Sequence, residues 1–253
     1  MDLNGKKVLV FGAGKSGIGA ADLLGSVGAQ PIIYDGNENL DKEAVLHKTN
    51  GTYTPEIWAG AFPEGEMESL DLVVLSPGVP TDLPLVKSFY AKGLPVWSEV
   101  ERAYRTGKGE VLAITGTNGK TTTTALLGKI MGDARESVFV VGNIGTAYTS
   151  KSLEMREDSV TVAEISSFQL ETIEQVRPKV SAILNITEDH LNRHHTMEEY
   201  IRVKELITKN QGSEDVCVLN YEDEVLRKFG ENIVPKVVYF SSARTLEEGI
   251  FLD

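Results

Sequence analysis

The chain has 253 residues, of which 41% are hydrophobic and 25% charged, and its formal net charge is −12. This composition is typical of a folded, water-soluble protein with one large or two modest domains, and we favour two. The acidic balance argues against nucleic-acid binding, because proteins that bind phosphate backbones carry basic surfaces. Cys217 is the single cysteine, which excludes an internal disulfide, and no apolar run approaches the roughly 20 residues of a membrane span. We expect a cytoplasmic protein.

Within the first hundred residues, short β-branched runs alternate with a helical pattern, which indicates a parallel sheet wrapped by helices. Ser16–Val27 has apolar residues at helical spacing, and Gly28 supplies a stop signal. Ser98, followed three residues later by Glu101, predicts the capped start of a short helix. Thr106–Gly109 is interpreted as a break between domains. The expected strands are Val8–Phe11, Pro31–Tyr34, Leu72–Leu75 and Pro95–Trp97.

A second alternating series follows the break. Its helices are expected at Thr121–Met131 and Met197–Lys209. Its strands are expected at Val111–Thr115, Ser137–Val141, Val160–Ala163, Val180–Leu184, Val216–Leu219 and Val237–Phe240. The fold prediction is therefore α/β, with an N-terminal Rossmann-like parallel-sheet domain at residues 1–107 and a P-loop-type α/β central domain at residues 108–253. Because Ile250–Asp253 resembles the beginning of a further strand, we expect a truncated enzyme with an incomplete central domain.

The string VLAIT-GTNGK-TTTTALLGKIM predicts a phosphate-binding loop between a strand and a helix. Glycines let the backbone approach the phosphates, Lys120 supplies an ammonium group, and a threonine hydroxyl can join the shell of a Mg²⁺ ion. The general P-loop pattern would place its first glycine at Ile114, so the spacing differs here. The alternative is a glycine-rich turn with an exposed lysine. The candidate ATP-binding residues are Gly116, Thr117, Asn118, Gly119, Lys120, Thr121 and Thr122.

A second glycine motif, Gly12–Gly17, follows the first expected strand, and Asp35 ends the second expected strand 18 residues beyond Gly17. This arrangement is typical of a dinucleotide site, in which the acid would bind a ribose hydroxyl of NAD. A nucleotide-sugar diphosphate at the helix N-terminus would require the same glycines. From the motif alone, both ligands remain open.

Four ordered strings, ITGTNGKTTTT, GNIG (Gly142–Gly145), EISSFQLE (Glu164–Glu171) and NITEDHLNRH (Asn185–His194), resemble the Mur ligases of peptidoglycan synthesis. The resemblance covers essentially the whole chain. It implies an enzyme that joins an amino acid to a UDP-N-acetylmuramoyl carrier at the expense of ATP. The SSFQLE string, and GAGKSG together with VVLSPGVP (Val73–Pro80), are most similar to the members that add D-glutamate to UDP-N-acetylmuramoyl-L-alanine. The alternatives are a ligase for another amino acid or for folate, and a non-catalytic nucleotide or NAD module.

The resemblance also implies roles for individual residues. The carrier carboxylate would take the γ-phosphoryl group of ATP, and the amine of D-glutamate would then displace phosphate. Lys120 would stabilise the transferring phosphoryl group, while Thr121 and Glu164 would hold Mg²⁺. His190 would bind a second Mg²⁺, and Lys204 matches a lysine that the family carbamylates and uses as a metal ligand. Lys120, His190 and Lys204 are accordingly the candidate catalytic residues.

For the carrier, the resemblance implies contacts from both domains, and it implies a third domain that binds D-glutamate and closes over ATP. The third domain is expected to be absent from this chain, so we expect the chain alone to be inactive. The implied cofactors are ATP and Mg²⁺, the partners are the two small-molecule substrates, and a monomer without a membrane span is expected. The candidate carrier-binding residues are Gly14, Lys15, Ser16, Asp35, Gly78, Asn143, Ser166 and Gln169.

Three of these residues also have simpler interpretations. Glu164 could be an ordinary charge at a strand end. His190 has the neighbours His194 and His195, which makes a zinc site an alternative. Lys204 could be a solvated lysine of a polar helix.

Overall fold

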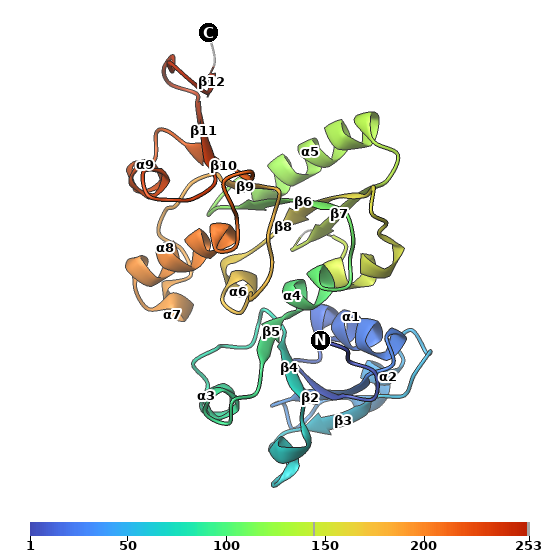
Figure 1. Ribbon diagram of the computed structural model, residues 1–253. Helices are drawn as coiled ribbons and strands as arrows, with labels where there is room; N and C mark the ends of the chain where they lie inside the picture. Colours follow the sequence, from blue (N-terminus) through green and yellow to red (C-terminus); the bar gives the residue numbers. More distant parts are fainter. Residues whose placement is uncertain (144, 252–253) are drawn as a thin grey trace. The chain divides into compact units, whose positions relative to one another are not determined.

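The computed structural model describes residues 1–143 and 145–251. Ile144 of the GNIG string, and Leu252 and Asp253 of the last expected strand, lie outside the described residues. The chain forms two compact units, each shown in Figure 1 with its own sheet. Unit 1 comprises Met1–Thr106, Ala147–Leu153 and Thr172–Glu174, and unit 2 comprises Gly107–Thr146, Glu154–Glu171 and Gln175–Asp253.

Unit 1 contains a five-stranded sheet in the order β3-β2-β1-β4-β5, and neighbouring strands pair in parallel. The four expected strands are present within one residue at each end. The sequence analysis missed β3, a short strand at the sheet edge. The strands are β1 Lys7–Phe11, β2 Gln30–Asp35, β3 Glu56–Ala59, β4 Leu72–Leu75 and β5 Val96–Ser98.

Helices cover both faces of this sheet. The strand side chains alternate between two apolar clusters, so that Val8 and Val10 pack with α1, whereas Leu9 and Phe11 pack with α3. Ser98 accepts a hydrogen bond from the backbone N–H of Glu101, which gives α4 its expected cap. The helices are α1 Lys15–Ser26, α2 Lys42–Leu46, α3 Pro84–Ala91 and α4 Glu99–Tyr104, with a 3-10 turn at Glu66–Ser69.

Unit 2 contains a seven-stranded sheet in the order β12-β11-β10-β9-β6-β8-β7, again with parallel pairings throughout. The predicted α/β class with parallel sheets is confirmed. β6 lies between β8 and β9, so the loop that follows it lies next to the carboxyl ends of both neighbours. The strands are β6 Glu110–Thr115, β7 Val138–Gly142, β8 Val160–Glu164, β9 Val180–Ile183, β10 Val216–Asn220, β11 Lys236–Ser241 and β12 Ile250–Phe251.

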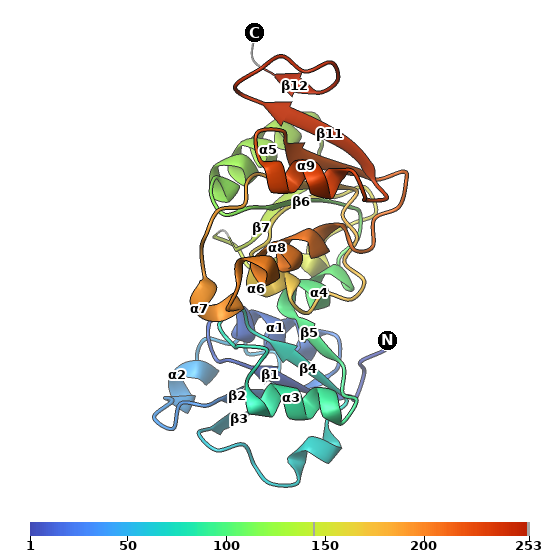
Figure 2. The same cartoon turned by 90° about the vertical axis from the view of Figure 1, so that its left-hand side faces the viewer.

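The longest helix of unit 2 packs on one face of the sheet, and two shorter ones lie on the other. Figures 1 and 2 show α5 on one side and α6 and α8 opposite. The helix expected at Met197–Lys209 ends earlier, at Glu205, because the chain tightens there into a 3-10 turn over Leu206–Thr208. The helices of unit 2 are α5 Lys120–Ala134, α6 Ser167–Leu170, α7 Leu191–His194, α8 Met197–Glu205 and α9 Glu224–Gly230. A 3-10 turn at Tyr148–Ser150 belongs to unit 1, and another at Ser152–Glu154 spans the point in the chain where unit 1 passes into unit 2.

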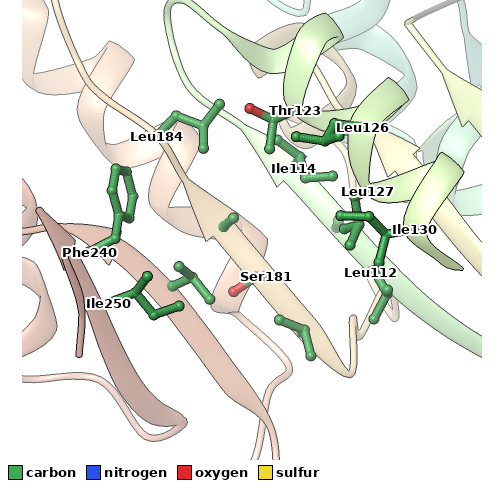
Figure 3. Close-up of a pocket in the computed structure, with 14 residues that line it drawn as sticks. Leu112, Ile114, Thr123, Leu126, Leu127, Ile130, Ser181, Leu184, Phe240 and Ile250 are labelled. Carbon is green, nitrogen blue, oxygen red and sulfur yellow. The ribbon is translucent and has the colours of Figure 1, made fainter. Parts of the chain in front are cut away.

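An open apolar hollow of about 800 Å³ lies beside α5 on the sheet of unit 2 (Figure 3). Its walls come from β6, β9, β10, β11, β12 and α5, and include Leu112, Leu184 and Phe240. Leu126 and Ile130 of α5 border it and are 60% and 54% exposed. No helix in the described ranges is long and apolar enough to cross a bilayer.

Candidate active site

The loop between β6 and α5 has the geometry of an anion-binding turn. Gly119 is the N-cap of α5 and has φ +84°, a left-handed conformation that a glycine adopts without steric cost. The first backbone N–H groups of a helix lack intrahelical partners and carry the positive end of the helix dipole. This loop therefore presents donors at the carboxyl edge of the sheet, as the sequence predicts.

Two lysines from different helices reach the same carbonyl oxygen of the loop. Lys120 Nζ donates to the carbonyl oxygens of Gly116 and Thr117, each at 2.8 Å. Lys204 Nζ, from α8, also donates to the Gly116 oxygen at 2.8 Å. The Lys204 side chain is not solvated, since the residue is only 1% exposed. Burial, assisted by the charge of Lys120, lowers the pKa of Lys204 to about 7.

An acid completes this edge of the sheet. Glu164, the last residue of β8, is 2% exposed. Its Oε2 accepts a hydrogen bond from the Thr121 hydroxyl at 2.8 Å, and its Oε1 accepts one from the Asn143 amide at 2.9 Å. The Thr121 and Glu164 oxygens are hard donors lying side by side, which is the ligand chemistry that Mg²⁺ prefers. These two residues therefore fit a Mg²⁺ ion. Thr122 is exposed in the first turn of α5, as Thr121 is.

Side chains that the sequence analysis did not single out hold the loop in place. Asn185, just after β9, accepts from the Asn118 N–H at 2.9 Å and donates to the Asn118 carbonyl at 3.0 Å. Thr117 Oγ1 accepts from the Thr187 N–H at 3.0 Å and lies 3.1 Å from the Tyr200 hydroxyl. Their place in the chain could have indicated this contact, because Asn185 and Thr187 lie just after β9, a strand that neighbours β6.

His190 stands at the start of α7 in a left-handed backbone conformation, with φ +54°. Its imidazole is half-exposed, lies 3.4 Å from Asp189 Oδ2, and has its ring centroid 5.0 Å from that of Phe168. His194 points elsewhere, since it is buried and its Nε2 lies 2.9 Å from Ser167 Oγ. Among the residues the structure describes, no three His, Cys, Asp or Glu side chains are grouped to hold a metal. The zinc site considered as an alternative therefore has no grouped set of ligands among the described residues.

Ser166 and Gln169 are engaged with each other. The Gln169 N–H donates to Ser166 Oγ at 3.3 Å, and Gln169 Oε1 accepts from the Ser166 N–H at 2.8 Å. This reciprocal pair is a capping box, which stabilises the start of α6. The capping role accounts for both residues locally, and their contact with a carrier stays a prediction.

The glycine loop of unit 1 also lies at a carboxyl edge, where Gly14 caps α1 and Lys15 and Ser16 form its first turn. Asp35 Oδ2 accepts from the Ala13 N–H, and Oδ1 accepts from the Asn37 N–H, each at 3.0 Å. Gly78 lies exposed after β4. Because β2, β1 and β4 are adjacent and parallel, the structure brings these predicted residues to neighbouring strand ends, where open α/β sheets bind ligands.

Comparison with known families gives two matches. Residues 114–248, more than half of the chain, match the Mur ligase middle domain. Residues 6–98 match the Mur ligase MurD-like N-terminal domain.

Curated relatives cover the full chain. A UDP-N-acetylmuramoylalanine–D-glutamate ligase of Lachnospira eligens is 56% identical over 253 residues. The enzymes of the same name from Lachnoclostridium phytofermentans and Clostridioides difficile are 57% and 45% identical. In each case the match takes in 100% of this chain and 56% of the relative, so the chain spans a little over half the length of the curated relatives it matches.

Solved structures support the fold. The UDP-N-acetylmuramate:L-alanyl-γ-D-glutamyl-meso-diaminopimelate ligase of Neisseria meningitidis superposes with a TM-score of 0.60 at 16% identity, over 97% of this chain and 82% of the other. The UDP-N-acetylmuramate-alanine ligase of Thermotoga maritima gives 0.51 at 23% identity, over 94% and 53%. At these identities, the likeness concerns the fold alone.

Proposed function

This chain belongs to the Mur ligase family, and from that premise we propose that it supplies the carrier-binding and ATP-binding parts of a ligase that adds D-glutamate to UDP-N-acetylmuramoyl-L-alanine. The names of the relatives that match the whole chain support this substrate pair. The observation that carries the proposal is the convergence of Lys120 and Lys204 on the carbonyl of Gly116, beside the Thr121–Glu164 pair. Because the chain spans 56% of those relatives, we assign the complete reaction to a longer protein that contains it.

The proposed reaction has two displacements. First, an oxygen of the alanyl carboxylate attacks the γ-phosphorus of ATP, and ADP leaves with the electron pair of the broken P–O bond. Next, the amine of D-glutamate attacks the carbonyl carbon of the acyl phosphate, loses a proton, and expels inorganic phosphate. Both steps bring anions together, so they require fixed positive charge and oriented donors.

Residues of the phosphate loop supply that charge. The Lys120 ammonium is already held at the loop by two carbonyl oxygens, so little reorganisation is needed when it binds a phosphate oxygen. The N-terminus of α5 offers backbone donors from the same side. We assign Lys120 to the transferring phosphoryl group and residues 116–122 to the binding of ATP phosphates.

Mg²⁺ would neutralise phosphate charge at Thr121 and Glu164, the pair whose oxygens fit it. We assign a second Mg²⁺ position to His190 and to Lys204 in its carbamylated form. Burial favours this modification, because a pKa near 7 leaves a large share of Lys204 as the neutral amine that adds to carbon dioxide. The carbamate nitrogen keeps one N–H, which can still donate to the Gly116 carbonyl.

In unit 1 we assign the carrier to the strand ends that hold Gly14, Lys15, Ser16, Asp35 and Gly78. The helix N-terminus of α1 suits a diphosphate, and Asp35 suits a hydroxyl or an N–H donor of the nucleoside. Further carrier contacts are proposed for unit 2, at Asn143, Ser166 and Gln169. We also propose that the protein is a cytoplasmic monomer, which light scattering and cell fractionation would check.

The test is ATP-dependent phosphate release by the full-length protein that contains this chain. We expect release only when UDP-N-acetylmuramoyl-L-alanine and D-glutamate are both present. A panel of other amino acids and folate acceptors serves as the control for specificity. Release with another pair would replace the substrate assignment, and no release with any pair would overturn the ligase proposal.

A further inference from the structure

Glu171, the last residue of the SSFQLE string, holds two consecutive residues of α7. Its Oε2 accepts a hydrogen bond from Arg193 at 2.7 Å, and its Oε1 lies 3.5 Å from His194 Nδ1. The Arg193 and Glu171 side chains are 11% and 8% exposed, so water screens this pair little. One carboxylate thus fixes the end of α7 against the segment that follows β8.

Phe168 extends the same contact toward His190. The Arg193 guanidinium lies 4.8 Å from the Phe168 ring centroid, and the His194 ring stacks on Phe168 at 5.4 Å and 25°. The His190 ring packs on Phe168 as well, at 5.0 Å. The three side chains around Phe168 therefore depend on one another for their positions.

The backbone at each end of α7, at His190 and at His195, has a conformation that non-glycine residues seldom adopt. His190 has φ +54°, and His195, which ends α7, has φ +67°. Such conformations persist where the surroundings over-determine them. The N–H groups of Arg193 and His194 donate to the His190 carbonyl at 2.9 and 3.0 Å, so whatever holds those two residues also holds the His190 backbone.

We propose that Glu171 is a positioning residue for His190: by holding Arg193 and His194, it fixes the turn that presents the His190 imidazole. The part of the proposal that concerns metal binding rests on the function proposed above, which assigns His190 to a Mg²⁺ ion. The contacts themselves do not depend on that function. Glu171 touches neither substrate nor metal in this assignment and acts through the two residues of α7.

The test is Glu171→Gln in the full-length ligase, because glutamine keeps the size and one oxygen acceptor but removes the charge. Residues that orient a metal ligand typically change metal affinity about 10- to 100-fold when replaced. We expect the Mg²⁺ concentration that half-saturates phosphate release to rise about tenfold or more. We expect kcat at saturating Mg²⁺ and the KM of the carrier to stay within about twofold. An unchanged Mg²⁺ dependence would overturn the positioning role.

A second readout does not require activity. Amide hydrogen exchange of residues 190–196 is measured in the 253-residue chain without substrates, and we expect faster exchange in Glu171→Gln. If the unaltered ligase releases no phosphate, the proposed function fails, and this exchange measurement alone decides whether Glu171 holds the turn. Unchanged exchange at residues 190–196 would overturn the proposal whatever the activity.

Two further variants show whether the effect passes through Arg193. In a double-mutant cycle, Arg193→Gln combined with Glu171→Gln is expected to raise the half-saturating Mg²⁺ concentration no more than the larger single change does. If the two single changes multiplied in the double variant, Glu171 would not act through Arg193. The matched control is Asp215→Asn, since Asp215 is another buried acid of unit 2 and accepts from Arg177 at 2.7 Å. It is expected to lower thermal stability while Mg²⁺ dependence and exchange at residues 190–196 stay unchanged.

Discussion

The two strand–loop–helix turns, Gly12–Gly17 in unit 1 and Gly116–Thr121 in unit 2, differ in the charge around them. The first is fastened by an acid, since Asp35 accepts the Ala13 N–H that would otherwise be offered to a ligand. The second has two cations, Lys120 and Lys204, on one carbonyl, beside the one carboxylate that accepts from Thr121. Glycines set the path of the backbone in both turns, while the neighbouring charges decide how much anionic charge each can accept. Related glycine patterns therefore need not imply the same ligand.

Removing a cation from the second turn is expected to have the largest effect on activity, and it tests whether charge distinguishes the two turns. We expect Lys120→Ala in the full-length protein to lower kcat by about 10³-fold, because the transferring phosphoryl group loses its preorganised charge. Carrier affinity, measured by calorimetry, is expected to stay nearly the same. Lys129→Ala is the matched control, since that lysine lies exposed on the same helix and pairs with Asp133. Equal losses of kcat and carrier affinity in Lys120→Ala would mean that the carrier binds at the phosphate loop.

In the first turn, backbone packing is expected to matter more than charge. A Cβ at Gly17 would lie 1.8 Å from the Gly12 carbonyl oxygen, whereas a Cβ at Gly14 would meet nothing within 4 Å. We expect Gly17→Ala to reduce the free energy of unfolding by about 3 kcal/mol, as urea denaturation would measure. Gly14→Ala is the control and is expected to change it little. Similar stability in the two variants would show that the turn can shift to accept the methyl group.

The two surroundings also differ in pH response, because Tyr200, which lies at Thr117 of the second turn, packs against the ring of the buried His194 at 5.2 Å. Burial, followed by the charge of Arg193, lowers its pKa from 6.5 to about 4. At pH values between about 4 and 6.5, His194 binds a proton in the unfolded chain but not in the folded chain. The free energy of unfolding should therefore fall by about 2 kcal/mol from pH 7 to pH 5 on account of this residue.

Urea denaturation at both pH values checks this sign. His194→Gln is expected to lose that part of the pH dependence, whereas His47→Gln, at an exposed histidine, keeps it. The same fall in the His194→Gln variant would assign the effect to another group.

The smallest expected effect concerns Tyr200, which supports the second turn through Thr117. Tyr200→Phe removes the hydroxyl that lies 3.1 Å from Thr117 Oγ1. We expect the free energy of unfolding to fall by about 1 kcal/mol, the usual net value of one such hydrogen bond. Thermal denaturation would measure it, and an unchanged midpoint would mean that the hydroxyl contributes no net stability to the loop.

Local patterns in the sequence predicted most of the strands and the parallel α/β class, because apolar alternation and helix caps depend on near neighbours. The Ser98 cap of α4 is such a case. Short edge elements such as β3, which has four residues, are too short to show a periodic pattern. The end of α8 was misjudged because the apolar spacing continues past Glu205, where the backbone already tightens.

The candidate site was harder to predict, because it depends on the order of the strands in the sheet more than on local sequence patterns. Thr121 and Glu164 meet because β6 and β8 are neighbours, although the chain runs through β7 between them. The contacts of Tyr200 and Glu171 likewise join segments far apart in sequence. Only the resemblance to a family suggested some of these residues. Glu171 ends one of the matching strings, but the resemblance gave it no role, because that role depends on a contact in three dimensions.

The apolar hollow on the sheet of unit 2 has a thermodynamic consequence. Side chains such as Leu126 and Ile130 already face solvent when the chain is folded, so unfolding adds little to their hydration. The heat-capacity change of unfolding arises mainly from newly wetted apolar surface. The folded chain should therefore show a smaller heat-capacity change than a chain of equal length in which this hollow is filled, and a flatter dependence of its stability on temperature.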